Sequence, residues 1–575
     1  MKRRSRATWA IAVFVLVAAL IAPAGASAHA QLEQTEPSRD ATVAEFPQAV
    51  SFTFSEPVEA NFGAVRVYSA DGDRVDDGRL TRADGDRKVA VGLRAGTGRG
   101  TFTATYRVVS ADSHPVSGGF VFHVGESSRQ TSATVAELVE EADSGPVTDA
   151  ANTVMTFLGY AALAFAFGGL VFLKFVLMPA ASRLGHTAES AIAGFRKRGD
   201  VLITVAVIAG VVSAVGELLL QGAIAAGQSL WSSLNAETIS SVVDTRSGTW
   251  MAVRVAVWVA IALTWLFSGR RRGAHTATAV LLVLLAVASE LPALVGHAGA
   301  TGPRLLTPIA DFIHVAAASI WIGGLAAAVI ALPAATAVLV PRQRSTLLVD
   351  VFARFSPLAL GSVILVVASG IVQSVVHLTS ISELIETAFG RAILAKALLL
   401  SILVGIAAYN RQIALPRLRR QSDAGESPGV VGTRIKRALS AEVLLAFAAL
   451  AVASMLVGYS PTSAAQGPFS ETTNIGPVEM QLTVDPASTG VNELHVYLLD
   501  PKTAAAFDDA EEFKLSARLD DPPVGPIELD ARKAGPGHYL VTSANFAVGG
   551  DWQLNAIVRV SDFDQYEKAV EFTVR

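Results

Sequence analysis

The sequence predicts a membrane protein with three folded parts: a small all-β domain, a bundle of eight transmembrane helices and a second β domain. The 575-residue chain is 51% hydrophobic and 17% charged. Its apolar residues are gathered in runs of about 20, the length that crosses a bilayer. On both sides of these runs the chain shows the alternation of apolar and polar residues that is typical of β-strands.

Composition narrows the function classes. The net charge of −4 gives no support to a nucleic-acid partner. The chain has no cysteine, so it can form neither disulfides nor thiolate metal sites, and any metal must be held by ligands such as His, Asp, Glu or Met. The GxxxxGK[ST] motif is missing from the sequence, so ATP-driven pumping through a P-loop has no support.

Residues 1–28 have the features of a secretory signal peptide. A basic start precedes an apolar core from Trp9 to Ile21, and Ala26-Ser27-Ala28 forms an A-x-A cleavage site. Cleavage after Ala28 would make His29 the first mature residue. An N-terminal His can bind one metal through its free amine and its Nδ1 atom, and nitrogen ligands of this kind suit Cu(II). The alternative is an uncleaved anchor helix, for which the apolar core is short.

Residues 29–124 predict a small all-β domain with a candidate metal site beside its N-terminus. Alternating runs are found at Ala49–Phe54, Ala64–Tyr68, Lys88–Leu93, Thr101–Val109 and Gly119–Val124. Before the last run, Asp112 and His114 are two residues apart, so in extended chain their side chains point to the same face. They could then complete a metal site that His29 begins.

This part of the chain resembles the CopC family of periplasmic copper-binding proteins. The matching residues are His29, Glu36-Pro37, Phe54-Ser55-Glu56-Pro57-Val58, and Asp112-Ser113-His114-Pro115-Val116-Ser117-Gly118 with Phe120-Val121-Phe122. The resemblance implies a Greek-key β-barrel that binds Cu(II) through His29, Asp112 and His114. Some members add a Met-rich Cu(I) loop, but residues 29–124 contain no Met. We expect His123 to be a surface or barrel histidine rather than a ligand.

Eight apolar runs within residues 150–460 are the predicted transmembrane helices, and an acidic linker at 125–149 precedes them. The runs lie near 150–178, 201–226, 249–268, 276–296, 308–331, 355–377, 391–410 and 439–459. Lys and Arg gather in the loops after the first, third, fifth and seventh runs, and the positive-inside rule makes these loops cytoplasmic. We therefore expect a multi-pass protein of the plasma (inner) membrane, with both terminal domains extracytoplasmic.

Ionisable side chains near the outer ends of these runs form a candidate metal path, because such groups are costly in a bilayer and are functional-site candidates by default. The set consists of Glu290, His297, Asp311, His314 and His377. Asp311 and His314 share a helix face at i,i+3 spacing, and Glu290 and His314 fall at similar depth on consecutive helices. The alternative is structural: Lys396 would neutralise Glu290 or Asp311, and Glu217 would take part in the same way.

The membrane block resembles the CopD family of inner-membrane copper-resistance proteins. The matching residues are His297, Asp311 and His314 with Trp321-Ile322-Gly323-Gly324, Arg354-Phe355-Ser356-Pro357, Gly390-Arg391, Lys396 and Asn410-Arg411. CopC and CopD parts in one chain resemble the YcnJ-type copper transport fusions, which are associated with copper uptake. The resemblance covers about residues 29–460.

Residues 462–575 return to a soluble composition and predict an Ig-like β-sandwich of six or seven strands. Alternating runs lie at Val478–Val484, Glu493–Leu499, Phe513–Leu519, Tyr539–Ser543, Trp552–Val560 and Ala569–Val574. Gly490-Val491-Asn492, Gly537-His538-Tyr539 and Gly549-Gly550-Asp551-Trp552 resemble the YtkA-like domain found beside such transporters. Met480, His495 and His538 are candidate soft or imidazole ligands, and ordinary strand or turn residues are the alternative.

Together these observations predict a copper-handling membrane protein that is not an enzyme. The outer domain would bind Cu(II), and the helical bundle would carry copper inward across the plasma membrane, with Cu(I) considered for the membrane domain. Inward movement of a unit positive charge gains about 2.3 kcal/mol per 100 mV. The expected partners are copper ions, the lipid bilayer and other extracytoplasmic copper chaperones.

Three alternatives stay open on sequence alone. Copper tolerance by extracytoplasmic sequestration would use the same residues as uptake. A copper-dependent oxidative enzyme would also use an N-terminal His, but Asp112 would crowd the coordination position that an oxidant needs. A membrane haem or copper redox protein would need two facing histidines at equal depth from among His297, His314 and His377.

Overall fold

The computed structural model describes most of the chain as a helical unit and a unit that holds both β domains. The described residues are 30, 32–38, 41–60, 64–94, 98–110, 115–125, 144–233, 235–268, 275–295, 306–378, 381–459, 469–485, 487–501 and 506–574. Four predicted site residues, His29, Asp112, His114 and His297, lie outside these ranges, as does the predicted signal peptide.

The N-terminal β domain consists of two four-stranded sheets packed on one core. One sheet has the order β1 (Leu32–Glu36), β3 (Ala49–Phe54), β6 (Lys88–Leu93) and β5 (Asp76–Ala83). The other has the order β2 (Thr42–Val43), β8 (Pro115–Val124), β7 (Gly100–Val109) and β4 (Val65–Ser69). Successive side chains of a strand point to opposite faces of the sheet, so Phe52 of one sheet and Phe120 of the other point into the core between the sheets. Their ring centroids lie 5.4 Å apart. All five predicted strands are present.

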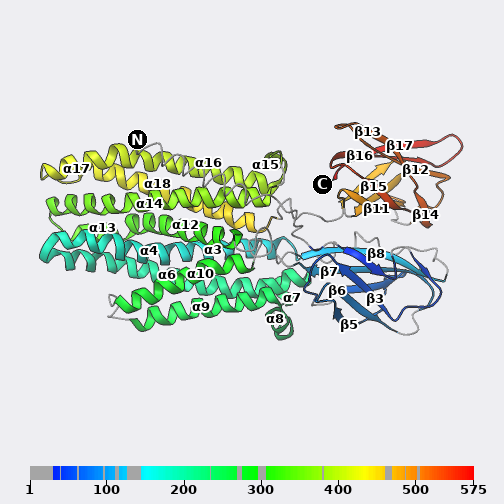
Figure 1. Cartoon of the computed structure of the whole chain (residues 1–575), viewed down its shortest axis with the longest axis horizontal. Helices are drawn as coiled ribbons and strands as arrows, with labels where there is room; N and C mark the ends of the chain where they lie inside the picture. The colour runs from blue at the N-terminus through cyan, green and yellow to red at the C-terminus, as the bar shows by residue number, and fades with distance from the viewer. Residues whose placement is uncertain are drawn as a thin grey trace, which may run out of the picture. The chain divides into compact units, whose positions relative to one another are not determined.

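Long helices make up the helical unit, and Figure 1 shows them side by side with nearly parallel axes. They are α3 (Pro146–Leu163), α6 (Ala188–Ala226), α9 (Arg246–Ser268), α10 (His275–Val295), α12 (Leu306–Ile330), α14 (Pro341–His377), α16 (Ala388–Tyr409) and α18 (Gly429–Val457). Shorter helices are α4 (Gly169–Val171), α5 (Met178–Ala181), α7 (Leu230–Ser233), α8 (Ala236–Val243), α13 (Leu332–Ala337), α15 (Glu383–Glu386) and α17 (Leu415–Asp423). Large apolar side chains such as Val205, Ile208 and Phe267 are exposed on the unit, which suits a surface that faces lipid.

Six helical stretches of the described chain are long and apolar enough to cross a membrane. The first, Pro146–Ala225, contains two of the predicted runs, which are separated where Gly185 adopts φ 61° and ψ −129°. The fourth predicted run corresponds to α10, whose apolar part, Thr276–Leu291, is shorter than the other stretches. A membrane protein with several apolar helices is therefore confirmed, and the count of eight spans stays a prediction.

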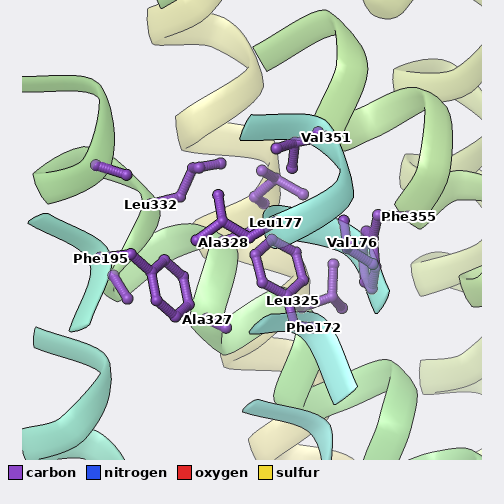
Figure 2. Packing of buried hydrophobic residues seen from close by; sticks show 14 of the residues in the cluster. Phe172, Val176, Leu177, Phe195, Leu325, Ala327, Ala328, Leu332, Val351 and Phe355 are labelled. Atoms are coloured by element: carbon purple, nitrogen blue, oxygen red, sulfur yellow. The ribbon is translucent and has the colours of Figure 1, made fainter. Parts of the chain in front are cut away.

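Close packing fixes α12 against the first helical stretch. Figure 2 shows Phe172, Phe195, Leu325, Ala328 and Phe355 within one buried cluster. A Cβ added at Gly168 would lie 2.7 Å from the Cα of Gly323, so only glycine allows the two backbones to approach this closely. Gly323 and its neighbours in the Trp321–Gly324 motif therefore have a packing role.

The C-terminal domain is formed by two sheets around one core. The five-stranded sheet has the order β14 (Arg532–Gly535), β15 (His538–Phe546), β11 (Gly490–Leu499), β10 (Val478–Asp485) and β9 (Phe469–Ile475). The four-stranded sheet has the order β13 (Val524–Leu529), β12 (Glu512–Leu519), β16 (Gly550–Arg559) and β17 (Gln565–Val574). All six predicted strands are present, and the Ig-like topology stays a prediction.

Candidate metal centre

Two polar pairs face each other between α12 and α14. On α12, Asp311 and His314 are three residues apart, and on α14, Ser369 and Gln373 are four apart, so each pair shares one helix face. His314 Nδ1 lies 3.1 Å from Ser369 Oγ, and Gln373 Nε2 donates to Asp311 Oδ1 over 3.2 Å. The structure therefore gives each of the two predicted residues on α12 a hydrogen-bond partner on α14.

Ser369 decides which nitrogen of His314 carries the proton. The Ser369 hydroxyl has one hydrogen, and it donates to the Leu365 carbonyl oxygen over 2.6 Å. We infer that the same oxygen accepts from His314, which assigns the proton of the imidazole to Nδ1. This tautomer leaves the lone pair of His314 Nε2 available to a metal. Metal-binding histidines are commonly held in one tautomer in this way, by a hydrogen bond to their other nitrogen.

Lys396 of α16 and Glu290 of α10 both interact electrostatically with Asp311. In the described part of the chain, however, Lys396 forms no ion pair with either carboxylate, whereas other ion pairs such as Arg183–Asp350 are formed. No direct ion pair is therefore formed, although Lys396 lies close enough to Asp311 to interact with it, and the structural alternative stays open.

Glu217 has a different partner from the one expected. It pairs with Arg254 of α9, and the two side chains are only 9% and 11% exposed. Ser213 donates to Glu217 Oε1 over 3.1 Å. Gly159 of α3 makes room for the pair, because a Cβ there would lie 2.7 Å from Arg254 Nη2. Glu217 therefore takes part in a structural ion pair, as the alternative expected, and its partner is Arg254. A lone arginine inside an apolar run requires such a buried partner.

The structure places the other predicted ligands separately. His377 lies at the end of α14, buried and edge-on to Phe389 with ring centroids 6.2 Å apart. It is four residues beyond Gln373, so it continues the same face of α14. His123 is buried in the N-terminal domain with its Nδ1 3.0 Å from Thr101 Oγ1, as expected for a barrel histidine.

Met480 and His495 lie on opposite faces of one sheet. Met480 is paired with Leu498, which packs in the core, whereas His495 is paired with Thr483 and lies on the outer face. The structure therefore does not bring these two candidate ligands together. In the residues that the structure describes, no group of three or more His, Asp or Glu side chains is arranged to hold a metal ion.

The fold and the polar cluster define a multi-helix membrane protein that carries a candidate metal centre between its helices. Residues 32–125 match the CopC domain, residues 147–305 match the copper resistance protein D-like N-terminal domain, and residues 349–456 match copper resistance protein D. CopC and CopD domains are therefore present together in one chain, as its motifs predicted.

Individual relatives agree with these domain matches. The chain is 28% identical over 503 residues to the copper transport protein CutJ of Bacillus subtilis (strain 168), covering 86% of this chain and 85% of that protein. It is 32% identical over 114 residues to Protein YobA of Escherichia coli (strain K12), covering 20% of this chain and 91% of that protein. It is 31% identical over 140 residues to the inner membrane protein YebZ of Escherichia coli (strain K12), covering 24% of this chain and 46% of that protein.

Two solved structures are similar to part of the chain. One is CopC from Methylosinus trichosporium OB3b, with 26% identity, a TM-score of 0.15, and coverage of 17% of this chain and 93% of that chain. The other is PcoC, a methionine-rich copper resistance protein from Escherichia coli, with 22% identity, a TM-score of 0.15, and coverage of 17% of this chain and 98% of that chain.

The resemblance of the C-terminal domain to YtkA-like domains stays a prediction.

Proposed function

We propose that this protein captures Cu(II) outside the cell and passes copper inward across the plasma membrane. The observation that carries the proposal is the facing of Asp311 and His314 with Gln373 and Ser369 inside an apolar helical bundle. A carboxylate and an imidazole are costly at such a place, and a histidine fixed in one tautomer is a typical metal ligand. The relative CutJ, a copper transport protein, supports copper as the cargo.

The outer copper site in this proposal consists of His29, Asp112 and His114. Described residues beside them support it: the Ala30 amide donates to Ser110 Oγ over 3.3 Å, and Ser110 Oγ donates to Glu56 Oε1 over 2.5 Å. Ala30 follows His29 directly, and Ser110 precedes Asp112 by two residues. The hydrogen bond therefore ties the two parts of the chain that would supply the ligands.

In the membrane, copper would pass His297 and His377 and reach the lone pair of His314 Nε2. Asp311 would balance the charge of the ion, and Gln373 holds that carboxylate in place by its hydrogen bond. Lys396 interacts with Asp311 and so balances the carboxylate while the site holds no cation. We propose uptake because a cation moving inward gains about 2.3 kcal/mol per unit charge and 100 mV.

Cellular copper content under copper limitation tests the proposal. Cells that lack the gene should hold less copper than wild-type cells, and cells with His314→Ala should match the deletion at normal protein abundance. His186→Ala, which changes a histidine in the turn between α5 and α6, is the control and should leave copper content unchanged. Higher copper content in the deletion strain would mean export and would overturn the direction.

A further inference from the structure

The C-terminal domain holds three polar side chains that the transport path does not use. Glu493 and His495 lie on β11, and His538 lies on the neighbouring strand β15. The alternate residues Leu494 and Val496 point into the core between the sheets, so Glu493 and His495 lie on the outer face. The three side chains are nevertheless buried, with exposures of 7%, 5% and 1% in chain order.

The two imidazoles meet at their nitrogen atoms. His495 Nδ1 lies 3.2 Å from His538 Nε2, and His495 Nε2 lies 3.4 Å from Glu493 Oε1. With its proton on Nε2, beside the carboxylate, His495 has a lone pair on Nδ1. Tyr497 stacks on His538 with ring centroids 4.3 Å apart and an interplanar angle of 6°, so the ring plane of His538 is fixed.

We propose that His495 Nδ1 and His538 Nε2 form a second copper site, in which Cu(II) takes the place of their shared hydrogen bond. Two bonds of about 2.0 Å to nitrogens 3.2 Å apart enclose an angle of about 106°, so one ion can bind both nitrogens at their present separation. The His538 proton moves to Nδ1, so both imidazoles stay neutral and no proton is released. Water molecules complete the coordination.

The surroundings favour a metal over a purely structural hydrogen bond. Both imidazoles are buried, and burial disfavours their charged form, so both can offer a neutral ring to a metal. The Glu493 carboxylate lies 3.4 Å from His495 Nε2, so a negative charge stands beside the proposed ligand.

The donor set points to Cu(II) among the divalent ions. Two imidazole nitrogens suit copper and zinc, and Cu(II) binds more tightly than Zn(II) to a given nitrogen site. The thioether of Met480, which would favour Cu(I), lies on the other face of the sheet. The choice of copper rests on the proposed copper-handling function, whereas the two-histidine site rests on the geometry alone.

Copper stoichiometry of the purified full-length protein tests this site. The starting protein is His114→Ala, in which the outer site is disabled, and His495→Ala or His538→Phe is added to it. Either substitution should lower the bound Cu(II) by one ion per chain and remove one set of nitrogen couplings from the EPR spectrum. Glu493→Gln should keep the stoichiometry and weaken the affinity about 10–100-fold.

The controls separate a metal site from a structural pair. His186→Ala should leave the stoichiometry unchanged, and Zn(II) should bind more weakly than Cu(II). Unchanged copper content in folded His495→Ala and His538→Phe proteins would overturn the site. If these variants do not fold, an unchanged copper affinity in Glu493→Gln would overturn it instead. Cellular copper uptake reports separately on the transport proposal, so failure of one leaves the other standing.

Discussion

Ser369→Ala should lower copper transport without lowering the amount of protein in the membrane. The hydroxyl group makes one contact outside its own helix, 3.1 Å to His314 Nδ1. Without it, the buried Nδ1–H loses its acceptor side chain, and an unsatisfied buried donor would cost about 1–3 kcal/mol. The imidazole can avoid that cost by moving its proton to Nε2, which removes the lone pair offered to copper.

The size of the effect follows from losses measured at other metal sites. Removing the partner of a metal-binding histidine weakens metal affinity or activity about 10–100-fold, which corresponds to about 1.4–2.8 kcal/mol. We expect the initial rate of copper uptake into copper-limited cells to fall by this factor. Ser369→Thr keeps the hydroxyl and should restore most of the rate.

Ser374→Ala is the matched control on the same helix. The Ser374 hydroxyl donates to the Gly370 carbonyl oxygen over 2.8 Å, a bond within α14. Its removal should therefore leave the uptake rate within about twofold of wild type, since such a bond contributes little to helix stability. Wild-type uptake in Ser369→Ala at normal abundance would refute the assigned tautomer, and equal losses in both variants would refute the special role of Ser369.

Three further predictions test other parts of the molecule. One residue added before His29, or His114→Ala, should greatly weaken Cu(II) binding in a competition titration, and unchanged affinity would remove the N-terminal chelate. A reporter that is active only in the cytoplasm should be silent when fused at Arg575, and activity there would contradict the predicted topology. Arg254→Ala should destabilise the detergent-solubilised protein by about 3–5 kcal/mol because Glu217 loses its partner. Replacing both residues by leucine should recover most of that loss in a thermal unfolding assay.

All central strands of the described sheets were predicted from the sequence, whereas of the edge strands only β4 and β17 were. The missed strands are β1, β2, β5, β9, β13 and β14, and in the described sheets each lies at an edge. Residues of β5 and β13 are mostly exposed, so these strands have no buried face to produce alternation. Alternation of apolar residues reports burial on one side, which central strands have and edge strands often lack.

The candidate site was predictable in its ionisable residues and less so in their partners. Asp311 and His314 could be identified because ionisable side chains are costly in an apolar run. Serine gives no such signal, because its hydroxyl can bond to the backbone of its own helix and is therefore common there. Ser369, Gln373 and His377 nevertheless repeat every four residues on α14, and this spacing could have revealed one polar face. Which helix that face meets depends on packing such as the contact between Gly168 and Gly323, which periodicity does not contain.

The Glu217–Arg254 pair also bears on how the protein is inserted into the membrane during synthesis. An arginine near the centre of a lone helix raises the free energy of insertion by about 2.5–3.5 kcal/mol. Arg254 is the ninth of the 23 residues of α9, and its partner Glu217 is on α6, which the ribosome makes first. The carboxylate is thus already made when α9 leaves the ribosome, so the order of the two helices along the chain allows the charges to compensate each other during insertion.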